Sequence, residues 1–271
     1  MAQRRKWDKT RVLEEIRKLQ SELKRKPVKR DSSNLYTYTR KFFSTWNNAL
    51  DAAGFEIKER QYPKIPNKLT PELAYFLGLL ITDGHIVFDK IHKRYRVMIF
   101  TSYELEKEII LRIIKKLFNY NASLRSKKYG FNKKINFEIH INSKELSEYF
   151  VNKFHIPSGA KSSIVRVPAV FSNSRDIMIE SFIRGVVDGD GTISSKSRCV
   201  RIASGSEKFL LDIIRLLNKI DIYCGNILKD PRNNTWVLYI SGTENLKKLY
   251  ERMYRNAQFY YPRKKGVWKG I

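Results

Sequence analysis

The sequence has little cysteine and no long apolar run. Cys199 and Cys224 are the only cysteines in 271 residues, and they show no metal-ligand spacing. This scarcity argues against a disulfide framework and suits a reducing, intracellular compartment. The longest apolar run, AYFLGLLI at 74–81, is too short to span a bilayer, and the basic start, MAQRRKWDKT, has no apolar signal core. We therefore expect neither a membrane protein nor a disulfide-rich secreted one.

Acidic residues are also scarce. The chain has 27 Asp+Glu against 53 Lys+Arg, a formal net charge of +26. A polyanion is the natural partner, because cations that contact phosphates release counterions on binding. The sequence is 42% hydrophobic and holds 15 Tyr and 15 Phe, which a disordered basic tail would lack. These features predict a folded nucleic-acid binder, although charge alone leaves open a generally basic, ribosomal-type protein.

The stretch GVVDGDGTISSKS, at 185–197, looks at first like a calcium-binding loop. If Asp188 were position 3 and Asp190 position 5 of an EF-hand, position 1 would be Val186 and position 12 would be Ser197. An EF-hand needs strong oxygen ligands at both of those places. The spacing therefore excludes this reading.

The same stretch belongs to an internal repeat. PELAYFLGLLITDGHIVF at 71–88 has the form of IMIESFIRGVVDGDGTIS at 177–194, and aligning Gly78 with Gly185 places Asp83 on Asp190. The patterns that follow each copy also agree: two strand-like segments, a helix, two further strands and a last helix. We predict an α+β protein made of two α-β-β-α-β-β-α units.

The segments FLGLLITDG and IRGVVDGDG resemble the two motifs of a single-chain LAGLIDADG homing endonuclease. The resemblance covers residues 70–271, about three-quarters of the chain. It implies two half-domains, at 71–172 and 173–271, related by pseudo-twofold symmetry. It also implies that their two sheets form a β-saddle that cups double-stranded DNA over a long, near-asymmetric target site. Two fused halves make a homodimer unnecessary, so we expect a monomer.

Each motif helix carries small residues four positions apart. Gly78 and Thr82 share one face of the first helix, and Gly185 and Gly189 share one face of the second. Such positions let two helix backbones approach closely, so we expect these four residues at the helix interface. The Thr70–Pro71 pair predicts that the first helix begins at Pro71.

Asp83 and Asp190 fall at the other ends of these helices. A carboxylate at a helix C-terminus opposes the macrodipole, and two adjacent carboxylates repel each other, so a divalent cation would offset both costs. The resemblance implies that both acids are catalytic and hold Mg²⁺, with the carbonyls of Thr82 and Gly189 as further ligands. Mn²⁺ is expected to substitute, and Ca²⁺ to bind without supporting cleavage. Structural helices with capping acids are the alternative.

Other site residues are carried by the resemblance alone. A lysine after the last helix of each unit could stabilise the charge of the transition state, which points to Lys161 and to Lys264 or Lys265. Ser102 and Ser204 stand where a polar, water-positioning residue is common. Asp188 has Ile81 as its counterpart in the first motif, and we expect it to cap the helix or to bond locally.

The polar strand faces and hairpin tips supply candidate DNA contacts, any of which could touch phosphate rather than a base. These candidates are Arg94, Arg96, Lys127, Lys128, Lys133, Lys134, Asn136, His140, Arg198, Arg201, Lys229 and Arg232.

Residues 1–57 are predicted to form a separate helical module, joined by a proline-containing linker at 58–70. KTRVLEEIRKLQSELKRK reads as an amphipathic helix, and two short helices follow, closing at Gly54. Trp7, Lys26–Pro27 and KFFSTWNNALDAAGF together resemble the repeat often attached to homing endonucleases, which implies a helix-turn-helix-like DNA-binding unit. A helical cap on the larger domain is the alternative.

Four functions remain in competition at this stage. The first is a site-specific DNA endonuclease, and the second is an intron maturase that binds structured RNA with the same fold. An intein is disfavoured, because the chain starts with Met and ends in VWKGI without flanking splicing segments. A non-catalytic DNA-binding regulator should have lost the acids at the motif ends, whereas Asp83 and Asp190 are both present.

Overall fold

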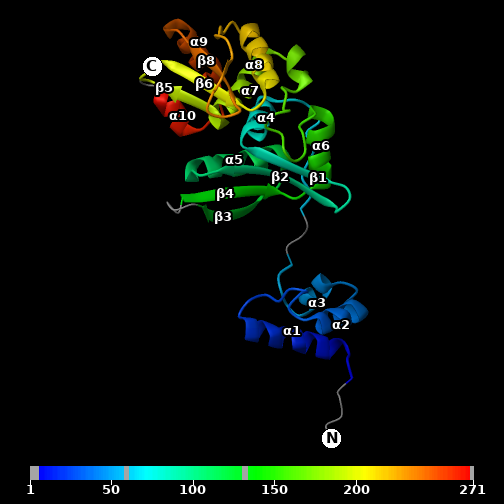
Figure 1. Ribbon diagram of the computed structural model, residues 1–271. Helices are drawn as coiled ribbons and strands as arrows, with labels where there is room; N and C mark the ends of the chain where they lie inside the picture. Colours follow the sequence, from blue (N-terminus) through cyan, green and yellow to red (C-terminus); the bar gives the residue numbers. More distant parts are fainter. Residues whose placement is uncertain (1–5, 58–60, 130–133, 269–271) are drawn as a thin grey trace. The chain divides into compact units, whose positions relative to one another are not determined.

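The computed structural model describes residues 6–57, 61–129 and 134–268 and divides the chain into two compact units, Met1–Arg60 and Gln61–Ile271 (Figure 1). Residues 58–60 of the predicted linker at 58–70 lie outside the described residues, and its described part belongs to the second unit. The Lys64 amide donates to the Phe118 carbonyl at 2.7 Å, so this proline-containing stretch lies along the larger unit and is bonded to it. No helix in the described part of the chain is long and apolar enough to cross a membrane.

The amino-terminal unit contains the three predicted helices, α1 (Lys9–Leu23), α2 (Ser33–Phe43) and α3 (Trp46–Ala52). Each begins at a side-chain cap, in which Asp8, Ser32 or Thr45 accepts a hydrogen bond from an amide in the first turn. Val12, Ile16, Leu35, Trp46, Ala49 and Leu50 form a core of their own. Gly54 has a φ of +89°, the left-handed conformation that favours glycine after a helix.

The first half of the larger unit follows the predicted order. Its elements are α4 (Pro71–Thr82), β1 (Gly84–Asp89), β2 (Arg94–Thr101), α5 (Glu104–Phe118), β3 (Ser123–Tyr129), β4 (Lys134–Ile141) and α6 (Lys144–Phe154). The predicted start of α4 is confirmed, since the Thr70 side chain accepts from the Leu73 amide at 3.2 Å and Pro71 opens the helix.

The second half repeats this order with shorter strands. A 3₁₀ turn (Ala169–Asn173) precedes α7 (Asp176–Gly189), β5 (Gly191–Ser194), β6 (Cys199–Ser204), α8 (Glu207–Lys219), β7 (Leu228–Lys229), β8 (Trp236–Ser241) and α9 (Thr243–Tyr254). A further short helix, α10 (Pro262–Val267), was not predicted from the sequence. The α+β prediction of two αββαββα units is confirmed, with α10 as an addition.

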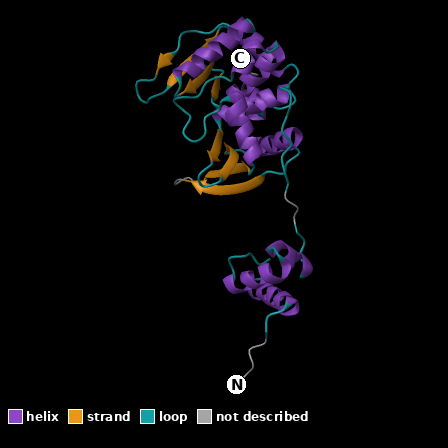
Figure 2. Cartoon of the chain, turned by 90° about the vertical axis from the view of Figure 1, so that its right-hand side faces the viewer, coloured by secondary structure: helices purple, strands orange, loops and turns teal. Residues whose placement is uncertain are grey.

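Each half builds one antiparallel four-stranded sheet. The strand orders are β1-β2-β4-β3 and β5-β6-β8-β7, so the second strand of each half pairs with the fourth. On one face, Ile86, Val97, Ile99, Ile139 and Ile141 of the first sheet are buried, and Val200, Ile202, Leu238 and Ile240 correspond to them in the second. Figure 2 shows the strands of this unit on one side and most of its helices on the other.

The two motif helices, α4 and α7, run through the centre of the unit and share one core. Residues 73–80 of α4 are all buried, including the central residues Tyr75 and Phe76. A helix that is apolar all round must be covered on every side, which explains why this segment lacks the polar face of the other helices.

Candidate functional site

The backbones of α4 and α7 touch at their glycines. A Cβ atom added to Gly78 would lie 2.5 Å from the Phe182 carbonyl oxygen and 2.8 Å from the Gly185 Cα, and one added to Gly185 would lie 2.2 Å from the Tyr75 carbonyl oxygen. No side chain fits in that space, so both positions require glycine for the close approach. Further along, a Cβ on Gly189 would lie 2.0 Å from Thr82 Oγ1. The structure thus brings together all four residues that the sequence places at the interface.

Because α4 and α7 touch, the carboxylates at their C-terminal ends lie close to each other. Asp83 ends α4 and Asp190 ends α7, and their amides still donate to Leu79 at 2.9 Å and Val186 at 3.0 Å. The Asp83 carboxylate oxygen Oδ2 lies 3.1 Å from where a Cβ of Gly189 would stand, next to the end of the partner helix. Within the described residues, neither carboxylate accepts a hydrogen bond or forms an ion pair.

The surroundings disfavour the charged form of both acids. Burial, followed by the negative charge of Asp190, raises the pKa of Asp83 to about 7. Desolvation by the surrounding protein also raises the pKa of Asp190, although the residue as a whole is exposed. Nearby Lys161 and Lys264 act in the opposite direction on both pKa values. When they are ionised, the two carboxylates therefore carry negative charge that no hydrogen bond or ion pair among the described residues compensates.

The two lysines stand at the ends of the motif helices. Lys161 Nζ donates to the carbonyls of Leu80 at 2.9 Å and Thr82 at 3.3 Å, and also to that of Ile81. These carbonyls carry the negative end of the helix dipole. Burial lowers the pKa of Lys161 to about 8. Both lysines lie close enough to the two aspartates for their positive charges to lower the pKa values of both acids.

At the other helix end, the sequence left Lys264 and Lys265 open, and the structure separates them. Lys264 is buried in the site, where its Nζ donates to the Gly191 carbonyl and burial lowers its pKa. Lys265 turns away, with Nζ 4.4 Å from the centre of the Tyr260 ring. Adjacent residues of a helical turn point in different directions, and the sequence alone does not show which of the two lysines points into the site.

The donor set around Asp83 and Asp190 fits a divalent cation. Oxygen ligands suit Mg²⁺, which keeps several waters and takes only one or two carboxylates. The described residues contain no cluster of three or more His, Cys, Asp or Glu side chains that could bind a metal without other ligands. A cation here would therefore complete its shell with water, a carbonyl or an oxygen of a bound anion. The predicted Thr82 carbonyl already accepts from Lys161, which leaves Gly189 as the freer carbonyl ligand.

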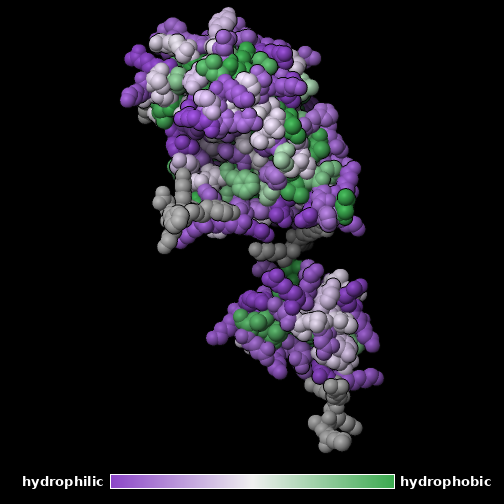
Figure 3. Space-filling model, viewed as in Figure 1, coloured by the Kyte–Doolittle hydropathy of each residue, from purple (hydrophilic) through white to green (hydrophobic). Residues whose placement is uncertain are grey.

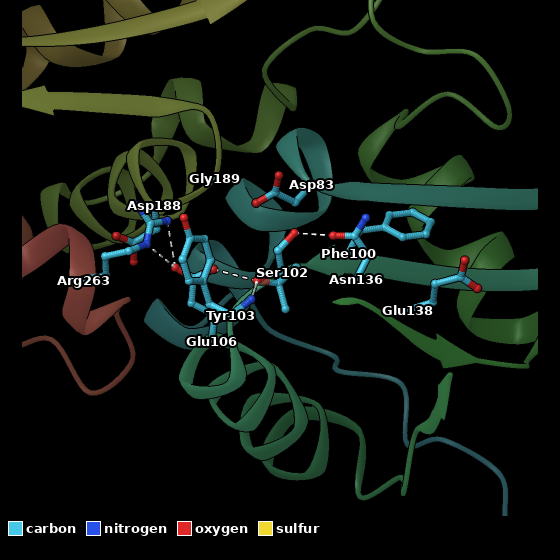
Figure 4. A pocket seen from close by; sticks show the side chains of 11 residues that line it. Asp83, Phe100, Ser102, Tyr103, Glu106, Asn136, Glu138, Asp188, Gly189 and Arg263 are labelled. Atoms are coloured by element: carbon cyan, nitrogen blue, oxygen red, sulfur yellow. Dashed lines mark hydrogen bonds and ion pairs between the residues drawn. The ribbon is translucent and has the colours of Figure 1, made fainter. Parts of the chain in front are cut away.

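A pocket of about 380 Å³ opens beside Asp83 (Figure 4). Glu106 reaches it from α5 and binds Arg263, whose Nη2 lies 2.9 Å from Glu106 Oε1. The Arg263 guanidinium stacks 4.1 Å above the Tyr103 ring. Ser102 lines the same pocket and donates to the Asn136 side chain, whereas Ser204 Oγ accepts from the Ser206 amide. Sequence reasoning missed Glu106 and Arg263, because their pairing joins residues 157 positions apart.

Asp188 does not bond locally as expected. It is 1% exposed, and its Oδ2 accepts hydrogen bonds from the Tyr75 hydroxyl at 2.8 Å and from the Tyr261 amide at 2.9 Å. Burial raises the pKa of Asp188 to about 7. Its partners lie on the other motif helix and in the carboxyl-terminal segment, so only the tertiary structure could reveal them.

The strand register of the first sheet decides which candidate DNA contacts share its open face. Arg96, Asn136 and Lys127 lie there, as does Arg94 at the hairpin end. Arg125 lies on the same face, opposite Glu138, and sequence reasoning missed it although it alternates with Lys127. This face therefore presents at least four cationic side chains.

Three candidates of the first sheet need correction or cannot be placed. Lys128 pairs with Ile135 on the opposite face from Lys127, because successive side chains alternate. His140 is on the open face but only 2% exposed, with Nε2 3.3 Å from Glu138 Oε2, so it cannot reach a ligand as it stands. Lys133 lies outside the described residues, and of Lys134 only the backbone is described, at the start of β4.

The second sheet offers fewer cations. Arg201 lies on its open face, paired with Tyr239, and Arg198 occupies the β5–β6 turn with a φ of 43°. Lys229 pairs with Trp236 on the core-side face, and its Nζ lies 5.5 Å from the centre of that ring. Arg232 is exposed and bound to Asp230 at 2.9 Å. Figure 3 shows a hollow in the larger unit, bordered partly by hydrophilic side chains and partly by paler or hydrophobic ones.

Family models match a segment in each of the two units. Residues 7–56 match the family model of a homing endonuclease associated repeat, and residues 178–254 match that of a LAGLIDADG-like domain. The homing endonuclease I-DmoI, in a structure with DNA and Ca, has a TM-score of 0.54 at 22% identity, over 73% of this chain and 96% of that one. DUF199/WhiA from Thermatoga maritima has a TM-score of 0.50 at 16% identity, over 76% of this chain and 61% of that one.

Curated relatives match over a small part of their own length. An A-type ATP synthase subunit of Pyrococcus abyssi is 29% identical over 76% of this chain and 19% of the relative. The RNA polymerase subunit Rpo1C of Methanocaldococcus jannaschii is 26% identical over 65% of this chain, again 19% of the relative. The chain thus spans about a fifth of the length of these two relatives. The chain therefore carries a homing endonuclease associated repeat at 7–56 and a LAGLIDADG-like domain matched at 178–254, and its larger unit has the fold of the LAGLIDADG homing endonuclease I-DmoI.

Proposed function

We propose that this chain is a site-specific endonuclease that hydrolyses phosphodiester bonds of double-stranded DNA with divalent cations held by Asp83 and Asp190. The main support for this proposal is a pair of carboxylates at the ends of two touching helices. Neither carboxylate has a hydrogen-bond or ion-pair partner among the described residues. The fold is also that of I-DmoI, whose structures contain DNA with Ca or Mn. The proposal is tested by incubating the protein with a randomised duplex library and Mg²⁺ and sequencing the new ends, which should share one target sequence.

The chain's own residues would supply positioning and charge. Asp83 and Asp190 would orient the cations, with the Gly189 carbonyl as a further ligand. Lys161 and Lys264 would place positive charge where negative charge develops on the phosphate. Divalent cations bound at such a site lower the pKa of water and offset the charge on the attacking and leaving oxygens. We expect Mg²⁺ or Mn²⁺ to support cleavage and Ca²⁺ to support binding alone.

A regulator without nuclease activity is the main competitor, because DUF199/WhiA shares this fold. The two aspartates favour the nuclease, because carboxylates repel DNA phosphates and would weaken binding on a surface that serves binding alone. Sequence-specific binding of DNA without cleavage, in either Mg²⁺ or Mn²⁺, would decide for the regulator.

The amino-terminal unit would add affinity without chemistry. Residues 1–60 hold 16 Lys+Arg and 8 Asp+Glu, and the unit has its own hydrophobic core. A tethered second binding unit raises total affinity because its binding becomes intramolecular. We therefore propose that this unit binds DNA beside the cleavage site. We also propose that the protein acts as a monomer.

The raised pKa of Asp83 predicts a pH-dependent gain in stability on Asp83→Asn. Its folded-state pKa, about 7, exceeds the usual 3.8, so the folded state binds more protons between these values and stability falls as pH rises through them. At pH 8 without divalent metal, the variant should be more stable by roughly 2–4 kcal/mol, and at pH 4 by little. Thermal unfolding at both pH values measures the difference.

Mg²⁺ should reverse this order at pH 8, because it stabilises only the protein whose carboxylate it binds. Asp89→Asn is a suitable control. Asp89 is paired with Arg94 at 3.2 Å and has a pKa lowered to about 2, so its replacement should destabilise the protein at pH 8 regardless of Mg²⁺. An Mg²⁺ response of Asp83→Asn equal to that of the wild type would contradict the metal assignment.

Arg125 and Lys128 form a matched pair on one strand for testing the DNA-binding face. Each substitution to Ala removes one positive charge, but the register places only Arg125 on the open face. Arg125→Ala should weaken DNA binding by about 5- to 100-fold, and Lys128→Ala by less than about 2-fold. Fluorescence anisotropy in Ca²⁺ measures both affinities. Equal losses would show that long-range charge, not the sheet face, sets the affinity.

A further inference from the structure

The two motifs differ at one buried position. Aligning the repeats places Asp188 where the first motif has Ile81, and both side chains are buried, at 1% and 4% exposure. Ile81 offers no hydrogen-bonding group. Asp188 instead accepts from the Tyr75 hydroxyl of the other motif helix and from the Tyr261 amide of the carboxyl-terminal segment. At this position of the motif, the chain therefore has a buried acid in the second half only.

The segment bound by Asp188 leads directly to Lys264. Three residues after the Tyr261 amide, Lys264 Nζ donates to the Gly191 carbonyl at the start of β5. Arg184, one turn before Asp188 on α7, donates to the Phe259 carbonyl at 3.0 Å on the other side of Tyr261. The motif helix thus holds this segment from within the core, at the point where it enters the site.

The first lysine is supported differently. Lys161 follows a loop that is bonded to β1, where the Gly159 amide donates to the Ile86 carbonyl at 2.9 Å and the Phe88 amide donates to Ser158 Oγ at 2.9 Å. These bonds join a loop to a strand of the same half and involve no residue of the motif helix. Loss of Asp188 would leave them intact.

We propose that Asp188 is a positioning residue for one of two cleavage centres, each of which cuts one DNA strand. The centre that contains Lys264 depends on Asp188, whereas the centre that contains Lys161 does not. The inference rests on the proposed endonuclease function. Without Asp188, the buried Tyr261 amide loses its acceptor and the segment can shift to find another. Displacement of a catalytic group by about 1 Å can slow a reaction by about 10²-fold.

Cleavage of a target duplex with a different fluorophore on each strand tests this proposal, because it yields a separate rate for each strand. Asp188→Leu should slow one strand by about 10²-fold, leave the other within about 2-fold, and accumulate duplex nicked always in the same strand. Lys264→Met should slow that same strand. Asp188→Asn should restore both rates, because the Asn side-chain oxygen can accept from Tyr261.

Two further variants complete the comparison. Ile81→Leu changes the equivalent position of the first half and should alter neither rate. Tyr75→Phe deletes only the hydroxyl that donates to Asp188 and should slow the same strand several-fold, which keeps the test valid if Asp188→Leu fails to fold. Equal slowing of both strands, or of neither, by both Asp188→Leu and Tyr75→Phe would overturn the inference. A wild-type protein that cuts neither strand would instead overturn the proposed endonuclease function.

Discussion

Asp83→Asn and Asp190→Asn should each abolish double-strand cleavage, with a loss of roughly 10³-fold or more, while DNA affinity in Ca²⁺-free buffer stays within a few-fold. Each substitution removes one charged ligand from the end of a motif helix and leaves the helix contact at Gly78 and Gly185 unchanged. Asparagine has almost the shape of aspartate, so the fold should persist. Plasmid cleavage in Mg²⁺ and a gel-shift titration measure the two effects separately.

Asp212→Asn is the matched control for this prediction. Asp212 lies on α8 and binds Arg166 at 2.6 Å and Arg215 at 2.9 Å, away from the motif ends. Its substitution makes the same chemical change outside the site and should leave the cleavage rate within about 2-fold. Cleavage at the wild-type rate by either motif variant would refute the assignment of the two acids.

DNA affinity should fall by about 10³–10⁵ between 50 and 200 mM salt, as expected for roughly 6–10 phosphate contacts. The net charge of +26 and the cations on the open face of the first sheet, Arg94, Arg96, Arg125 and Lys127, motivate this slope. Each neutralised phosphate releases counterions, and added salt opposes that release. An anisotropy titration of a target duplex at several salt concentrations gives the slope directly.

A chain that begins at Gln61 separates the contribution of the amino-terminal unit. The two units have separate cores, so the shorter chain should fold and still cut. It should bind more weakly, with a shallower salt slope and a shorter footprint. An unchanged slope would show that the amino-terminal unit does not contact DNA, and a flat response of the full chain would point to a partner other than a polyanion.

Local patterns predicted most of the fold. Helical spacing, the Thr70 cap and Pro71 placed the start of α4 correctly, because a cap and a first turn involve only neighbours in the sequence. The repeat predicted both halves. The third strand of the second half is short, since β7 holds only Leu228 and Lys229, and α10 was not predicted. A short edge strand and a two-turn helix carry too few residues for a periodic pattern to stand out.

Alternation along β4 predicted which residues face away from the helices, but not whether they are exposed. His140 lies on the predicted open face and is 2% exposed. Burial, together with the charges of Arg96 and Arg125, lowers its pKa. The period of a strand determines direction, whereas exposure depends on side chains from adjacent strands that are distant in sequence.

The sequence by itself determined that this protein is a basic, two-motif chain whose motif helices carry glycines for close contact and end in aspartates. Those features follow from composition and from spacing within single helices. Only the tertiary structure decided that Lys264 rather than Lys265 enters the site, and that Asp188 binds Tyr75 and Tyr261. Each of these outcomes depends on how a side chain is oriented toward partners brought near by folding, and spacing along the chain does not encode that orientation.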